Sequence, residues 1–173
     1  MALGGQIKFY RVSNKMYAKL NITRRLTPRK TLKQRGAAAA RPALQILYNS
    51  KNISNAQKLT KAATAKEPRV EFPAQPSKLH TLIMWDIDAP AKPSWVHWIA
   101  INMETAADIA THTLLPYEGP NPPYGAHRYR FAIFEQLTGG LIIPPPPRPH
   151  FDIDTFVNNN HLKMLYTRYI VVQ

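Results

Sequence analysis

Two apolar stretches near the middle of the chain decide its fold: LIMWDIDAP at residues 82–90 and WVHWIAINM at residues 95–103. Both are rich in β-branched and aromatic side chains, which favour strands. Prolines at positions 90 and 93 separate them, and proline cannot continue a strand ladder. We therefore expect two neighbouring β-strands, over residues 79–85 and 96–102, joined by a short loop.

The other apolar runs are short and are separated by prolines, which mark loops. Further strands are predicted where apolar residues run together or alternate with polar ones, at residues 43–48, 70–72, 129–136 and 167–172. Residues 51–68 are polar and predict a loop or a marginal helix. A short helix is predicted at residues 154–157, with Asp154 as its cap. The chain is thus predicted to be mostly β, with few short helices.

The densest proline run comprises Pro144 to Pro147 and Pro149. It predicts an extended polyproline II segment. Such a segment has two interpretations: a ligand for a proline-recognition domain, or a stiff loop of this fold. The stiff loop is the interpretation that we favour.

Positive charge is concentrated at the start of the chain. The first 66 residues hold 15 of the 23 lysines and arginines and none of the 10 acidic residues. Basic side chains attract phosphates through counterion release, and the interleaved Phe9, Tyr10 and Tyr17 can stack on bases. An acid-free, basic start is also typical of a mitochondrial transit peptide. We interpret residues 1–41 as an extended basic arm, with these candidate RNA-binding residues: Lys8, Arg11, Lys15, Lys19, Arg24, Arg25, Arg29, Lys30, Lys33 and Arg35.

Several classes of protein are excluded. The chain has no cysteine, so it forms neither a disulfide nor a thiolate metal site. No stretch approaches the roughly 18–20 apolar residues of a membrane-spanning helix, and the start lacks the apolar segment of a secretory signal. The sequence contains no Gly-x-Ser-x-Gly motif and no glycine-rich phosphate loop. We therefore do not expect an enzyme.

Four residues could form a polar site. Asp86 and Asp88 follow the first predicted strand, and on an extended backbone residues two apart face the same side. His97 lies in the next strand, and His127 lies in a glycine-containing turn. If the fold brings the four together, they form a pocket with two carboxylates and two imidazoles. Such a cluster could hold a metal ion, or it could donate hydrogen bonds to an anion.

At these residues the sequence resembles the phosphatidylethanolamine-binding protein (PEBP) family. Residues 82–90 and 95–103 resemble its first motif, residues 119–120 and 125–136 resemble its second, and residues 151–156 resemble a later segment. The resemblance covers roughly residues 42–173. It implies an antiparallel β-sandwich whose small edge pocket binds phosphate-type head groups rather than a metal, and it implies no cofactor. The implied pocket residues are Asp86, Asp88, Pro90, Trp95, His97, His127 and Tyr129.

Two functions are compatible with a PEBP-like domain that carries a basic arm. A PEBP-like domain with added segments occurs in the large subunit of the mitochondrial ribosome, and the layout of this chain is similar. We therefore expect a structural component of that subunit, in the mitochondrial matrix, whose arm binds ribosomal RNA beside neighbouring ribosomal proteins. The alternative is a freestanding, cytoplasmic PEBP-type protein that binds ligands or regulates by recognising phosphate-type head groups.

Overall fold

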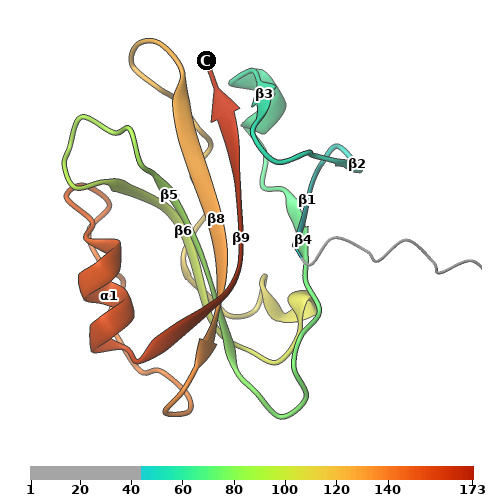
Figure 1. Ribbon diagram of the computed structural model, residues 1–173, viewed down its shortest axis with the longest axis vertical. Coiled ribbons are helices and arrows are strands. Elements are labelled where there is room, and N and C mark those ends of the chain that lie inside the picture. Colours follow the sequence, from blue (N-terminus) through green and yellow to red (C-terminus); the bar gives the residue numbers. More distant parts are fainter. Residues whose placement is uncertain (1–43) are drawn as a thin grey trace, which may run out of the picture. The chain divides into compact units, whose positions relative to one another are not determined.

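The computed structural model describes residues 44–173, and Figure 1 shows their arrangement. The ten basic residues predicted to bind RNA lie outside the described residues, as does the boundary predicted after residue 41. No helix between residues 44 and 173 is long and apolar enough to cross a membrane.

A six-stranded sheet forms the centre of the domain (Figure 1). Its middle consists of four long strands: β5 (His80–Asp86), β6 (Trp95–Met103), β8 (His127–Gln136) and β9 (Leu162–Val172). Two short strands, β3 (Gln57–Leu59) and β7 (Thr113–Leu115), form its edges. In the order β3-β9-β8-β5-β6-β7 all neighbours are antiparallel, except that β3 and β9 run parallel. The strands predicted at residues 79–85, 96–102 and 129–136 are confirmed.

A smaller sheet and a helix lie on opposite sides of the central sheet (Figure 1). The smaller sheet has the order β2-β1-β4 and contains β2 (Lys51–Asn52), β1 (Gln45–Tyr48) and β4 (Arg69–Glu71). Helix α1 spans Ile153–Asn159, and two 3₁₀ turns, η1 (Ala62–Thr64) and η2 (Ala106–Asp108), lie in connections. The prediction of a mostly β sandwich with few short helices is confirmed.

The central strands are buried on both faces because their apolar side chains point both ways. Towards the smaller sheet, Trp98 and Phe131 belong to one buried cluster, which includes Ile46 of β1. Towards α1, Ile99 and Phe134 belong to a second cluster. In the sequence, a strand that is covered on both faces is a continuous run of apolar residues rather than an alternation of apolar and polar residues. This is why β5 and β6 stand out so clearly in the sequence.

Three local predictions are wrong. The carboxylate of Asp152 accepts hydrogen bonds from the backbone N–H groups of Asp154 and Thr155, so Asp152 caps α1 and Asp154 lies in its first turn. Residues 51–68 contain β2, β3 and η1: β2 pairs with the neighbouring β1, and β3 pairs with the distant β9, which the local pattern cannot reveal. Strand β9 begins at Leu162 rather than at residue 167, since its first half is only partly buried and lacks a continuous apolar run.

A buried polar cluster fixes the end of β8. The side-chain oxygen of Gln136 accepts from the Thr81 hydroxyl at 3.0 Å and from the Asn102 backbone N–H at 2.7 Å. Its amide nitrogen donates to Asn102 Oδ1 at 2.9 Å and to the Gly139 carbonyl at 2.8 Å. Gln136 is only 4% exposed, and its hydrogen bonds join β5, β6 and the loop after β8.

Candidate ligand-binding pocket

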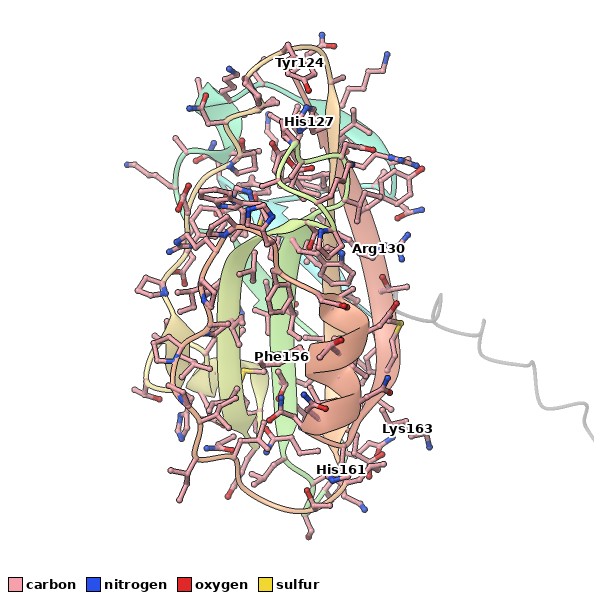
Figure 2. All side chains as sticks on the ribbon, turned by 90° about the vertical axis from the view of Figure 1, so that its left-hand side faces the viewer. Tyr124, His127, Arg130, Phe156, His161 and Lys163 are labelled. Carbon is pink, nitrogen blue, oxygen red and sulfur yellow. The ribbon has the colours of Figure 1, made fainter. Side chains whose placement is uncertain are left out.

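A cavity of about 300 Å³ opens at the end of the central sheet where β5 ends and β6 and β8 begin. Five of the seven residues implied by the PEBP resemblance line it: Asp86, Pro90, Trp95, His97 and Tyr129. Strand register brings them together, because Asp86 pairs with Trp95 of β6 and with Tyr129 of β8. Figure 2 shows that His127, at the start of β8, lies at the end of the domain opposite to His161.

Asp86 and His127 form a buried pair beside the cavity. His127 Nδ1 donates to Asp86 Oδ2 at 2.7 Å, and both side chains are almost fully buried. His127 is not among the lining residues; its ring stacks on that of Tyr129, with centroids 6.4 Å apart. It also meets the exposed ring of Tyr124 edge-on at 5.9 Å (Figure 2). Asp86 thus orients the imidazole and leaves Nε2 as its available nitrogen.

His97 and Tyr129 present uncharged polar groups to the cavity. Burial lowers the pKa of His97, whose Nδ1 lies 2.8 Å from the backbone carbonyl of Glu118. Because a carbonyl only accepts, the neutral ring carries its proton on Nδ1, and Nε2 is an acceptor. Burial and, next, the negative charge of Asp86 raise the pKa of Tyr129, so that its hydroxyl stays protonated.

Trp95 lines the cavity and carries a buried indole N–H. Its indole Nε1 is buried and has no hydrogen-bond partner within residues 44–173. The Nε1 of Trp98 has none there either, but Trp98 lies in the core, edge-on to Tyr117 at 5.5 Å. A buried N–H without a partner costs roughly 1–3 kcal/mol. A ligand oxygen that reaches Trp95 would therefore be stabilised.

Asp88 does not line the cavity. Strand β5 ends at Asp86, and the following turn directs Asp88 to Arg128 instead. Arg128 Nε and Nη2 donate to the two carboxylate oxygens of Asp88 at 2.9 and 2.7 Å. The expectation that both acids face the same side assumes an extended backbone through residue 88, and the chain turns before that point.

Arg128→Gln is expected to raise the pKa of Asp88 from about 2 towards its ordinary value. The hydrogen bonds from the Arg128 side chain are the main cause of the lowered pKa, and burial opposes them. Because the pKa is lower in the folded than in the unfolded protein, the ionised pair stabilises the fold above about pH 4. That contribution is lost as the pH falls through about 2.

An NMR titration of the Asp88 carboxyl carbon measures this shift. Arg130→Gln is the matched control, because the Arg130 guanidinium lies over the Trp85 ring, 5.8 Å from its centroid. An Asp88 pKa that is the same in Arg128→Gln and in the wild type would contradict the prediction.

Sequence reasoning missed one wall of the cavity, which is formed by Glu118, Asn121 and Pro123. This wall packs closely on η1: a Cβ atom on Gly119 would lie 3.0 Å from the backbone oxygen of Thr64. Only glycine allows such an approach without a shift of the backbone. The signal that could have revealed this wall is the proline-rich run at residues 119–123, with which the second family motif begins.

The lining of the cavity contains carboxylates but no lysine or arginine. Asp86 and Glu118 are acidic, whereas His97 and Tyr129 are neutral. A ligand that brings its own positive charge, together with oxygens for the Trp95 N–H, matches this lining. Within residues 44–173, no group of three or more His, Cys, Asp or Glu side chains is arranged to hold a metal ion.

The fold and the pocket define a class of protein: the chain belongs to the phosphatidylethanolamine-binding protein family, whose model matches residues 49–169. It is 33% identical to the rice (Oryza sativa subsp. japonica) protein MOTHER of FT and TFL1 homolog 2, over 66% of this chain and 71% of that protein. It is 31% identical to TERMINAL FLOWER 1 of Arabidopsis thaliana, over 65% and 68%.

Two solved structures share the fold. Carboxypeptidase Y inhibitor, solved in complex with its cognate proteinase, has a TM-score of 0.63 at 20% identity and matches 76% of this chain and 84% of the other. The phosphatidylethanolamine-binding protein of Plasmodium vivax has a TM-score of 0.59 at 23% identity and matches 75% of this chain and 84% of the other.

The relatives correct the first functional prediction. They are PEBP-family proteins and a proteinase inhibitor, not components of a ribosome. The expected role as a structural component of the mitochondrial large ribosomal subunit is therefore wrong. A basic segment is a property of many proteins, and its charge alone does not identify an RNA partner. The location of the protein in the cell stays a prediction.

Proposed function

We propose that this protein is a freestanding, non-catalytic PEBP-type binding protein whose pocket takes a small phosphate-type head group. The observation that carries this proposal is a cavity of about 300 Å³ that Asp86, Trp95 and His97 line, together with a buried Trp95 indole N–H that has no partner within residues 44–173. The family description and the name of the Plasmodium vivax protein support the class of ligand.

The polar groups divide into two kinds that match the two ends of a zwitterionic head group. Phosphate oxygens can accept from the Trp95 N–H. The carboxylate of Asp86, which accepts from His127 Nδ1, lies beside it in the lining. The neutral Nε2 of His97 can accept a hydrogen from the ammonium group.

The absence of catalysis is part of the proposal. Within residues 44–173, the lining of the cavity includes no serine, threonine, cysteine or lysine nucleophile. The imidazole of His97 is held by a backbone carbonyl rather than by a side chain that it could activate. The arrangement therefore favours binding over group transfer.

Titration of the full chain with O-phosphoethanolamine, followed by NMR, tests this function. We expect saturable binding that shifts the indole N–H resonance of Trp95 and leaves that of Trp98 unchanged. Trp98 is an internal control, because its Nε1 is equally buried and unpaired but faces the core. Inorganic phosphate and ethanolamine, titrated separately, are expected to bind more weakly than the complete head group. A Trp95 resonance that does not move at saturating concentrations would overturn the proposal.

A further inference from the structure

The proline-rich loop is attached along the first residues of β6, beside the cavity. The backbone N–H of Val96 donates to the Arg148 carbonyl at 2.9 Å, and that of Phe151 donates to the Ser94 carbonyl at 3.0 Å. The Ser94 hydroxyl donates in turn to the Phe151 carbonyl at 2.6 Å. The end of the proline run is thus an added strand-like segment next to Trp95, with which Pro149 forms a bridge.

The side chain of Arg148 reaches from this loop across three segments. Its Nη1 donates to the carbonyls of Val96 and His97 at 3.2 and 2.9 Å, and its Nη2 donates to the Pro116 carbonyl at 2.8 Å. Its Nε lies 2.9 Å from Glu118 Oε2. All three guanidinium nitrogens are therefore engaged, and the side chain is 22% exposed.

His97 and Glu118, the two residues of the cavity lining that Arg148 contacts, are also hydrogen-bonded to each other. The Glu118 backbone N–H donates to the His97 carbonyl at 2.9 Å, and His97 Nδ1 donates to the Glu118 carbonyl at 2.8 Å. Arg148 adds a third connection, because it holds the His97 carbonyl and the Glu118 carboxylate at once. The carbonyl that determines the tautomer of His97 therefore belongs to a residue that Arg148 holds in place.

We propose that Arg148 is a positioning residue for the pocket: it fixes Glu118 and, through the Glu118 carbonyl, the orientation and tautomer of the His97 ring. In this role the proline run is a stiff loop that holds the Arg148 guanidinium beside the cavity wall. A proline-recognition domain that bound Arg148 would have to break its contacts with four residues. The ligand-affinity part of this inference rests on the proposed function, whereas the effect on His97 does not.

Lysine cannot replace arginine here. A guanidinium is a planar fork with five donors, whereas an ammonium is a compact point charge. In Arg148→Lys the charge opposite Glu118 is retained, but one ammonium cannot reach the carbonyls of β6, the Pro116 carbonyl and the carboxylate together. Arg148→Gln removes both the positive charge and the planar arrangement of five donors. Comparison of the two variants separates the geometric contribution of Arg148 from its charge.

The test combines a measurement of His97 with a measurement of affinity in the full chain. In the ligand-free wild type, the ¹⁵N chemical shifts of the imidazole should report a single Nδ1–H tautomer for His97. In Arg148→Gln and in Arg148→Lys we expect a mixture of tautomers and about 10-fold weaker binding of O-phosphoethanolamine, equivalent to one lost hydrogen-bonded contact. Arg130→Gln, which removes a guanidinium remote from the cavity lining, is the control and should change neither quantity.

The outcomes are distinguishable. If a folded Arg148→Gln variant keeps both the wild-type tautomer and the wild-type affinity, the inference is wrong. If the wild type does not bind O-phosphoethanolamine, the proposed function fails, but the imidazole shifts still decide whether Arg148 positions His97. If Arg148→Gln does not fold, the same measurements are made on Arg148→Lys and Glu118→Gln. Imidazole ¹⁵N chemical shifts of His97 that are unchanged in both variants would overturn the inference.

Discussion

Asp86→Asn is expected to weaken the binding of O-phosphoethanolamine by about 10- to 100-fold, the effect of losing a charge-assisted hydrogen bond. The amide can still accept from His127 Nδ1, which donates to Asp86 at 2.7 Å in the wild type. It carries no charge, however, so the hydrogen bond that orients the imidazole is no longer charge-assisted, and the negative charge at this part of the cavity lining is lost.

Asp88→Asn is the matched control, because it makes the same chemical change two residues away. Asp88 lies outside the cavity lining and pairs with the exposed Arg128, so its replacement should change the affinity by less than about two-fold. Isothermal titration calorimetry on both variants, with thermal unfolding to confirm that each is folded, measures the difference. Equal losses of affinity in the two variants would contradict the separate roles that we assign to the two acids.

Gln136→Leu is expected to lower the free energy of unfolding by about 3–5 kcal/mol. The leucine has a similar size but makes none of the four hydrogen bonds of Gln136. It would leave the buried Thr81 hydroxyl and the half-buried Asn102 N–H without these partners. The penalty for each unsatisfied buried group is roughly 1–3 kcal/mol, which is why the total is large.

Urea unfolding measures this loss, and Thr81→Val is its control. Thr81 contributes only one hydrogen bond to the cluster, from its hydroxyl to Gln136 Oε1 at 3.0 Å, so that variant should lose about 1 kcal/mol. A Gln136→Leu variant that loses no more than Thr81→Val would show that water replaces the missing hydrogen bonds. The cluster would then contribute little to stability.

The central sheet could be predicted from the sequence because other parts of the domain cover both of its faces. Strands β5 and β6 are buried on both faces, which makes each a continuous apolar run that few other structures produce. Strands β2 and β3 could not be predicted. They are two and three residues long, too short to give a clear sequence pattern. Strand β2 pairs with the neighbouring β1, whereas β3 pairs with β9, and that second pairing depends on the finished fold.

The same distinction applies to the pocket. Asp86, Trp95 and Tyr129 lie at or near the ends of strands. Pairing of these strands therefore brings the three residues together. Glu118 and Arg148 come from loops beside proline-rich runs; these runs mark the loops, but they do not determine which side chains reach the cavity. The prediction for Asp88 failed for a related reason: the strand ends before it, and element ends are the least predictable feature of a fold.

Strand β9 comes last in chain order, yet it lies between β8 and β3 in the sheet, and its final residues pair in parallel with Gln57–Leu59. During synthesis, β3 therefore waits without a partner, and the open edge of β8 stays exposed, until residues 162–172 have left the ribosome. The early strands cannot form a complete sheet on their own. The sheet can therefore be completed only after β9 has been synthesised, and a chaperone that shields the β8 edge of the nascent chain until then would act at the step where aggregation is most favoured.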